Sequence, residues 1–213
     1  MSVERAGYTL RARVFVDLSN LELSVSQYTN GRHRLDWTRF PQWLVEQAEQ
    51  KVLPGQQGDL VFEGCFVYMS FNPNKDTGRK MHNWAMYTLG RISGVQVKCH
   101  ERRPKRYPIC PHCHKPVTVC PDCRQAFDRT EEKGVDTSIV TDLLKFAWEG
   151  AYDIAVLVSS DADFVPAVEF LTAKGKRIIQ AGFPPAGAEL ARVCWASLDL
   201  RPNISEVFRD GGS

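Results

Sequence analysis

The sequence contains no apolar run long enough to cross a lipid bilayer, which takes roughly 20 consecutive residues. The first residues, MSVERAGYTLRARVFVDL, carry scattered charges and lack the apolar core of a signal peptide, so we expect a cytoplasmic protein without membrane contact. Neither a P-loop nor a G-x-G-x-x-G motif occurs, which argues against a nucleotide-driven motor or a dehydrogenase. The composition, 213 residues with 43% hydrophobic and 24% charged side chains, predicts one well-packed domain with a small addition.

Charge is nearly balanced in total but unevenly distributed along the chain. The formal net charge is +2, yet the segment from Lys75 to Arg106 contains nine Lys and Arg residues against two Asp and Glu. The acids are therefore concentrated elsewhere. This distribution indicates one region that meets anions and another that is rich in carboxylates.

Short apolar runs alternate with amphipathic stretches along the chain. The runs are rich in Val, Ile and Phe, as strands buried on both faces of a parallel sheet are. Strands that alternate with helices predict an α/β fold built on a parallel sheet. The expected strands are residues 12–18, 62–71, 95–100, 154–160 and 176–183, and the expected helices are residues 37–50, 82–89, 135–150 and 164–175. Residues 101–130 break the pattern and form an insertion.

Acidic residues stand where expected strands end or an expected helix begins. Asp17 follows the first apolar run, Asp161 and Asp163 follow VLVSS, and Asp136 opens the helix after the insertion. The carboxyl ends of parallel strands converge at one edge of the sheet, so we expect these four carboxylates to lie close together. A divalent cation would offset their repulsion, and oxygen ligands favour Mg²⁺ or Mn²⁺ over Zn²⁺.

Each of these acids, taken singly, is also compatible with a role outside a shared metal site. An acid just before a helix is a common N-cap, which would account for Asp136 or Asp163 alone. The D-x-D of SSDAD also occurs in topoisomerase-primase domains, which need a glutamate at an earlier strand end, where this chain has Asp17. An aspartyl-nucleophile phosphatase needs D-x-D-x-T after its first strand, and DLSNL lacks it. The coincidence of three such positions favours a shared metal site.

Three ordered segments resemble one protein family. They are VFVDLSNL near the N-terminus, EKGVDTSIVTDLL after the insertion, and LVSSDADFVPAVEFLTAKGKRI in the last third. They resemble the NYN branch of the PIN-like nucleases, particularly its bacterial LabA-like members, from about Arg11 to Ala181. This resemblance implies a Rossmann-like three-layer α/β/α PIN-like domain with a mostly parallel sheet. We expect residues 11–100 and 131–205 to be its two parts, and residues 101–130 to be a basic, zinc-ribbon-like insertion.

The resemblance also implies roles for individual residues. Asp17 and Asn20 match a D-x-x-N motif, Asp136 matches the acid of K-G-V-D, and Asp161 and Asp163 match S-D-x-D-F. The implied site binds Mg²⁺ or Mn²⁺ through the four aspartates and hydrolyses RNA, leaving a 5′-phosphate and a 3′-hydroxyl. Asn20 cannot titrate, so we expect it to orient an acid, a water or the substrate.

Two further residues belong to the motif after the insertion. Asp142 matches a recurring acid, but it lies six residues after Asp136 and hence on another part of the helix surface, which argues against metal contact. Lys133 matches the basic residue of the motif. It could reach a phosphate or be a solvated loop lysine.

Basic residues beside aromatic ones mark the expected substrate-binding region. The segments RKMHNW (79–84) and HERRPKRY (100–107) combine Lys and Arg with Trp84 and Tyr107, a mixture that binds phosphates and stacks on the bases of single-stranded nucleic acid. A charge run can also be a solvated face, and Trp84 itself is more typical of a core residue. The residues expected to contact RNA are Arg79, Lys80, Arg102, Arg103, Lys105, Arg106 and Lys133.

Four of the seven cysteines form two C-P-x-C pairs inside the insertion. Cys110 pairs with Cys113 and Cys120 with Cys123, and six residues separate the pairs. Four thiolates complete a tetrahedral structural Zn²⁺ site with no open position. The alternatives are a redox dithiol or a pair of disulfides, which the expected cytoplasmic location disfavours. The insertion could hold RNA, form a homodimer or contact another protein.

The sequence as a whole predicts a divalent-metal-dependent ribonuclease with a zinc-stabilised insertion that contacts single-stranded RNA. Two alternatives stay open. One is a catalytically weak RNA-binding regulatory module, which weak metal affinity would distinguish from the nuclease. The other is a nuclease that acts on DNA, because a metal site that engages phosphate need not sense the 2′-hydroxyl.

Overall fold

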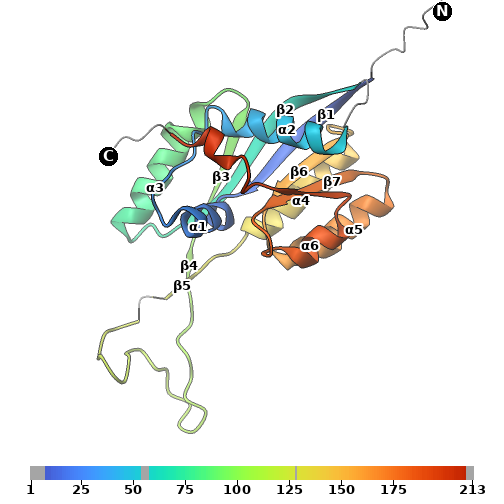
Figure 1. Cartoon of the computed structure of the whole chain (residues 1–213). Helices are drawn as coiled ribbons and strands as arrows, with labels where there is room; N and C mark the ends of the chain where they lie inside the picture. Colours follow the sequence, from blue (N-terminus) through green and yellow to red (C-terminus); the bar gives the residue numbers. More distant parts are fainter. Residues whose placement is uncertain (1–7, 54–57, 128, 210–213) are drawn as a thin grey trace, which may run out of the picture.

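A parallel sheet forms the centre of the molecule, whose computed structural model describes residues 8–53, 58–127 and 129–209 (Figure 1). The strand order is β3-β2-β1-β6-β7-β8, and every neighbouring pair is parallel. β1 and β6 lie side by side at the centre of the sheet. β2 and β3 follow outward from β1 on one side, and β7 and β8 follow outward from β6 on the other. The strands are β1 (Tyr8–Asp17), β2 (Gly58–Phe71), β3 (Val95–Glu101), β6 (Ile154–Val158), β7 (Arg177–Gly182) and β8 (Ala196–Asp199).

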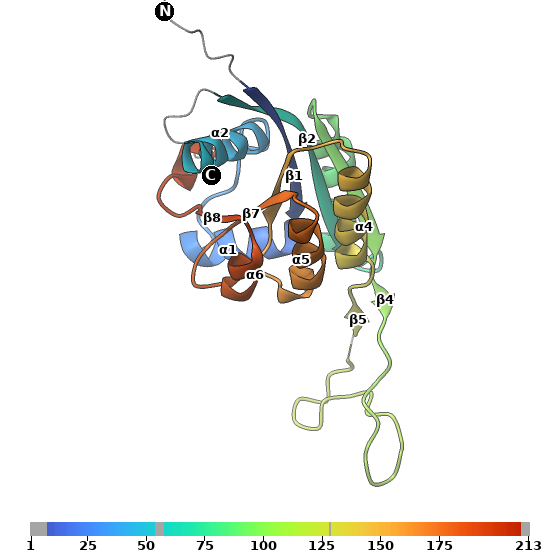
Figure 2. The same ribbon diagram turned by 90° about the vertical axis from the view of Figure 1, so that its right-hand side faces the viewer.

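Helices cover both faces of the sheet (Figure 1, Figure 2). The first three pack on one face and the last three on the other, so that two hydrophobic cores form. Alternation along β1 serves both cores: Val14 and Val16 face the first, and Phe15 faces the second. Within the described ranges no helix combines the length and apolarity that a membrane span requires. The helices are α1 (Leu18–Thr29), α2 (Phe40–Val52), α3 (Asp76–Tyr87), α4 (Val135–Trp148), α5 (Val165–Ala173) and α6 (Ala188–Val193).

The predicted three-layer α/β/α fold with a mostly parallel sheet is confirmed. Two helices, α1 and α6, and strand β8 were not expected. The helix expected from residue 37 begins at Phe40, because Asp36 accepts hydrogen bonds from the N and Oγ1 of Thr38 in a preceding turn and Pro41 occupies the first helical turn. The helix expected from residue 82 begins at Asp76, inside a polar stretch without apolar periodicity.

The insertion extends away from the sheet as a long excursion (Figure 2). Its base is a short antiparallel ribbon of β4 (Arg103–Pro104) and β5 (Thr130–Glu131). Beyond the ribbon the described residues form turns and isolated bridges, and none from Arg102 to Phe127 is buried. Side-chain packing therefore contributes little to holding this segment together.

Candidate functional site

The carboxyl ends of β1 and β6 mark the point where the strand order reverses, which is the usual location of ligand sites in open α/β sheets. β1 ends at Asp17, and β6 is followed by Ser159, Ser160 and Asp161. α4 begins after Gly134, whose left-handed backbone (φ 94°) turns the chain from the insertion into the helix. Segments that are distant in sequence thus deliver polar residues to one edge of the sheet.

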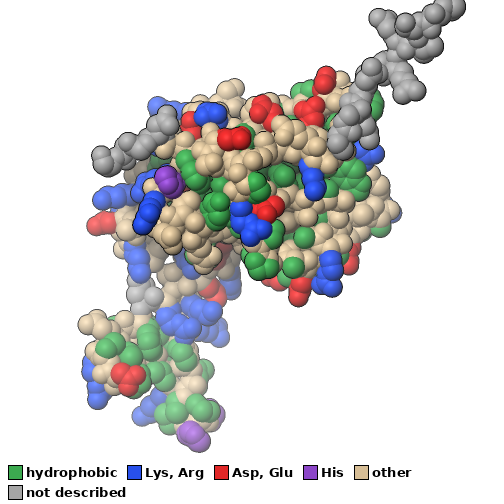
Figure 3. All heavy atoms as spheres, in the orientation of Figure 1, with side chains coloured by type: hydrophobic (Ala, Val, Ile, Leu, Met, Phe, Trp, Pro, Cys, Tyr) green, Lys and Arg blue, Asp and Glu red, His purple; other side chains and the backbone are tan. Residues whose placement is uncertain are grey.

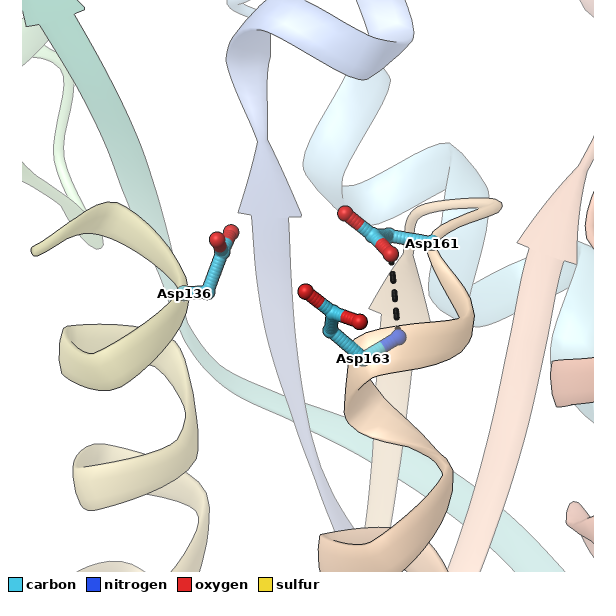
Figure 4. A group of neighbouring side chains, drawn as sticks. All are labelled: Asp136, Asp161 and Asp163. Atoms are coloured by element: carbon cyan, nitrogen blue, oxygen red, sulfur yellow. Dashed lines mark hydrogen bonds between the residues drawn. The ribbon is translucent and has the colours of Figure 1, made fainter. Parts of the chain in front are cut away.

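Asp136, Asp161 and Asp163 form an acidic cluster at this edge (Figure 4). One carboxylate oxygen of each lies within 4.8 Å of the others. Asp136 comes from the first turn of α4, whereas Asp161 is the N-cap of the 3-10 helix η2 (Ala162–Phe164) that contains Asp163. The backbone N of Asp163 donates to Asp161 Oδ1 at 2.9 Å. Among the described residues, no other group of three or more Asp, Glu, His or Cys side chains lies close enough to share a metal ion.

The electrostatics of the cluster suit a cation. The pKa of Asp136 is raised above its ordinary value, first by burial and then by the negative charges of Asp161, Glu132 and Asp163. A divalent cation would offset this repulsion. Because the donors are oxygens alone, the cluster could hold Mg²⁺ or Mn²⁺ more readily than Zn²⁺.

Asp17 is buried near the cluster and is not one of its three members. The residue is 5% exposed, its Oδ1 accepts a hydrogen bond from Asn20 N at 3.1 Å, and its Oδ2 accepts one from Ser159 Oγ at 3.5 Å. Burial raises its pKa to about 6, and neighbouring carboxylates, including Asp136, contribute to the rise. Three of the four predicted ligands therefore meet directly, and Asp17 adds a fourth carboxyl group to their surroundings.

Asn20 connects α1 to the loop that follows β6. Its Oδ1 accepts hydrogen bonds from Ser160 N at 3.1 Å and Ser160 Oγ at 2.8 Å. Gln180 of β7 supports the same loop by donating from Nε2 to Ser159 O at 2.9 Å. The geometry thus supports a positioning role for Asn20, exerted through the loop that carries Asp161.

Glu132 is an additional acid of the site that sequence reasoning missed. It follows β5, and its negative charge is among the causes that raise the pKa of Asp17 and Asp136. Its Oε2 accepts hydrogen bonds from Ser70 Oγ and from Arg102 Nη1, the latter at 3.3 Å. The residue stands at the first position of EKGVD, so an acid beside the motif was the available signal.

Several of the predicted RNA-contacting cations are paired with acids of this chain. Lys133 Nζ lies 2.8 Å from Glu131 Oε1, and Arg102 forms an ion pair with Glu132. Arg79 pairs with Asp76 and also donates to the carbonyl of Pro73 at 2.8 Å. The other expected contacts are divided between a cavity beside α3, lined by Lys80 and Trp84, and the exposed base of the insertion, where Arg103, Lys105, Arg106 and Tyr107 lie.

Asp142 takes part in a buried polar network on α4. It is 5% exposed, and its Oδ2 accepts hydrogen bonds from Tyr68 Oη and Lys98 Nζ, both at 2.6 Å. Asp142 is not a member of the acidic cluster. Its partners on β2 and β3 indicate that it stabilises the packing of α4 on the sheet.

Replacement of Asp142 by Ala is expected to lower the free energy of unfolding by about 2–3 kcal/mol, because it leaves the Tyr68 hydroxyl and the Lys98 ammonium without their acceptor. Urea unfolding followed by circular dichroism measures the loss, and Asp142→Asn, which keeps one oxygen, should lose less. Titration of the folded Asp142→Asn protein with Mn²⁺ should give the wild-type affinity. A tenfold weakening would instead assign Asp142 to the metal site.

The four cysteines of the insertion form two similar turns. In each turn a residue with left-handed backbone, His114 (φ 55°) or Arg124 (φ 60°), follows the second cysteine. Its N–H donates to the carbonyl of the first cysteine, Cys110 at 2.9 Å or Cys120 at 3.0 Å. Backbone N–H groups within each turn also bond the first thiol and lower its pKa. The four sulfurs do not gather into one group in the described chain, so the predicted zinc site is not confirmed.

A parallel α/β sheet with an acidic cluster at its central reversal point defines an open α/β domain with a candidate metal site. The family model of the NYN domain matches residues 11–200, and the chain belongs to this family, whose members are typically nucleases. The predicted membership in the NYN branch of PIN-like domains is thus confirmed.

Comparison with solved structures agrees with this fold. The chain is similar to a protein of unknown function from Vibrio parahaemolyticus RIMD 2210633, with a TM-score of 0.52 and 19% sequence identity over 90% of this chain and 93% of that chain. At this identity the likeness extends to the fold alone. No curated protein is significantly similar to the chain.

Proposed function

We propose that this protein is a divalent-metal-dependent ribonuclease that hydrolyses phosphodiester bonds at Asp136, Asp161 and Asp163. One observation carries the proposal: in a domain of the NYN family, carboxylate oxygens from α4 and from the end of β6 lie within 4.8 Å of one another. Three carboxylates at this spacing repel one another unless a cation lies among them. We propose Mg²⁺ or Mn²⁺ as that cation.

The residues of the site have two kinds of role in the proposed reaction, holding the metal and positioning the loop of Asp161. A bound divalent cation lowers the pKa of a water molecule and offsets charge on the phosphate. Asp136, Asp161 and Asp163 would hold the cation. Asn20 keeps the Asp161 loop in place through its bonds to Ser160. Hydrolysis would leave a 5′-phosphate and a 3′-hydroxyl, as the family resemblance implies.

The proposal is tested with end-labelled single-stranded RNA, duplex RNA and single-stranded DNA, each incubated with Mg²⁺, Mn²⁺ or EDTA. We expect cleavage of single-stranded RNA in either metal and none in EDTA. Preferential cleavage of DNA would change the proposed substrate from RNA to DNA and would leave the proposed metal mechanism unchanged. Binding of RNA without cleavage under any metal would overturn the proposal and assign the protein to RNA-binding regulators.

We also propose that the four cysteines of the insertion bind one structural Zn²⁺. Two turns with the same hydrogen bond and a left-handed residue at the same position each present a pair of thiols. Backbone N–H groups lower the pKa of the first thiol of each pair, which favours its thiolate form. Because none of the described residues from Arg102 to Phe127 is buried, metal–thiolate bonds would supply the stability that packing does not.

Purified protein is therefore expected to contain about one zinc ion per chain, because four thiolates complete one tetrahedral site. Inductively coupled plasma mass spectrometry measures this zinc content. Cys113→Ser should lose most of the zinc, because three thiolates leave the tetrahedron incomplete. Cys99→Ala, which removes a thiol outside the insertion, is the matched control and should keep it. Zinc-free wild-type protein with disulfides in the insertion would contradict the prediction.

A further inference from the structure

A polar cavity lies between the end of β2, the start of α3 and the base of the insertion. Its volume is about 640 Å³. Four of its lining residues are cations, Lys75, Arg102, Lys105 and Arg129, and none of the lining residues is acidic. Hydroxyl groups such as that of Thr77 complete the polar lining. A cavity with this lining attracts anions and can also donate several hydrogen bonds to them.

The walls of the cavity come from two parts of the chain. The domain contributes the end of β2 and the first turns of α3, which approach closely: a Cβ on Gly78 would lie 2.1 Å from the carbonyl oxygen of Asn72. The insertion contributes Lys105 and Arg129, whose backbones are joined by a hydrogen bond from Lys105 N to Arg129 O at 3.0 Å. The base of the insertion is therefore one wall of an anion-binding cavity. Lys and Arg side chains gather where the insertion meets the domain (Figure 3).

Arg102 connects this cavity to the acidic site. Its Nε donates to Thr130 Oγ1 at 3.2 Å, and its Nη1 donates to Ser70 Oγ and Glu132 Oε2, both at 3.3 Å. Ser70, Arg102 and Thr130 line the cavity, whereas Glu132 lies four residues before Asp136 of the acidic cluster. One guanidinium group thus lies between the cationic cavity and the carboxylates.

We propose that this cavity is a phosphate-binding subsite that holds the nucleic-acid backbone next to the phosphodiester cleaved at the acidic cluster. This inference rests on the proposed function. Phosphates repeat at every nucleotide, so a strand with one phosphate at the carboxylates has another within one or two nucleotides of it. A lining with four cations and no acid favours binding of such a group. The insertion accordingly serves to hold the substrate, through the residues at its base.

The test compares the wild type with Lys105→Ala/Arg129→Ala, which removes two cations of the subsite from the insertion side. Lys174→Ala/Arg192→Ala removes the same charge from exposed positions near α5 and α6 and is the matched control. Fluorescence anisotropy with labelled single-stranded RNA in EDTA measures binding without cleavage. Hydrolysis of RNA and of bis(p-nitrophenyl) phosphate, which has no second phosphate, is measured with Mn²⁺.

We expect the subsite variant to bind RNA about tenfold more weakly and to show a shallower salt dependence of binding, because two phosphate contacts are lost. The ratio of kcat/KM for RNA to kcat/KM for bis(p-nitrophenyl) phosphate should also fall about tenfold, since the small diester does not reach the cavity. The control pair should change both quantities less than twofold, as exposed distant charges do. Thermal unfolding of each variant establishes that it is folded.

If both double variants bind RNA equally more weakly than the wild type, the subsite is overturned, because the effect would then come from general attraction between the protein's positive charge and RNA. An unchanged RNA affinity in the subsite variant would overturn it as well. Absence of any cleavage by the wild type would defeat the proposed function, while the anisotropy measurement would still decide on the subsite. The phosphate in the subsite could be a terminal 5′-phosphate or an internal phosphate of the backbone, and RNA with a 5′-phosphate or a 5′-hydroxyl distinguishes the two. If the subsite variant loses affinity only for the 5′-phosphorylated RNA, the subsite binds a terminal phosphate and the backbone proposal is overturned. An equal loss of affinity for both RNAs assigns the subsite to the internal backbone.

Discussion

Asp136→Asn and Asp161→Asn are each expected to lower kcat/KM for RNA cleavage about 100-fold or more while the fold is kept. Each substitution preserves the shape of the side chain and removes one negative charge from a cluster whose oxygens lie within 4.8 Å of one another. The cation that the cluster would hold loses a charged ligand, so both its affinity and its effect on a bound water fall. Asp163 is more exposed, and Asp163→Asn should cost about tenfold.

Single-turnover cleavage of end-labelled RNA over a range of Mn²⁺ concentrations measures this effect, and calorimetric titration of Mn²⁺ without RNA measures the metal affinity separately. Asp153→Asn is the matched control, because Asp153 lies just before β6, at the opposite end of the strand from the cluster, and pairs with Arg11. Wild-type rates in folded Asp136→Asn and Asp161→Asn would show that cleavage does not occur at the cluster.

The positions of the acids at the sheet edge could be predicted because they depend on local pattern. A short apolar run that ends in an acid specifies both a buried strand and the residue at its carboxyl end, as at Asp17 and Asp161. The parallel topology then brings such ends together. Helix α1 was not predicted, because its sequence LSNLELSVSQYT contains three serines and is a weak helix former. Its start is fixed by Asp17, which caps it from the end of β1.

The partners of the other charged residues could not be predicted, because they are far apart in sequence. Glu132 bonds Ser70 across 62 positions, and Asp142 bonds Tyr68 across 74. Helix geometry alone argues against metal contact by Asp142, which lies six positions after Asp136. The buried partners of Asp142, and the place of Glu132 near the cluster, depend instead on how α4 and the base of the insertion pack on β2.

The insertion shows a further limit of sequence patterns. Each C-P-x-C spacing fixes the geometry of one turn, which the two equivalent hydrogen bonds at His114 and Arg124 reproduce. In the proposed zinc site, closure of one turn on the other would depend on metal–thiolate bonds, because the segment buries no side chain among its described residues from Arg102 to Phe127. The position of its base was likewise unpredictable, since it depends on where the ribbon of β4 and β5 leaves the sheet.

Asp17→Asn is expected to stabilise the metal-free protein at neutral pH, even though it weakens the proposed site. The pKa of Asp17 is about 6 in the folded protein, against an ordinary value of 3.8. The folded state therefore binds the proton more tightly, so stability from this group is fully present below about pH 4 and is lost as the pH rises through about 6. A difference of about two pKa units corresponds to about 3 kcal/mol.

Asparagine removes this penalty, because it carries no charge to bury and its side-chain oxygen can still accept the hydrogen bond from Asn20 N. In EDTA at about pH 7.5, thermal unfolding should give a Tm on the order of 5–10 °C above the wild type, and the two proteins should converge near pH 4. Mg²⁺ should raise the Tm of the wild type more than that of the variant, since only the wild type has the buried charge to offset. Asp153→Asn should act in the opposite direction, because Arg11 lowers the pKa of Asp153 and its charge is stabilising. A lower Tm for Asp17→Asn at all pH values would show that the Asp17 carboxylate is stabilised in the folded state and would contradict this prediction.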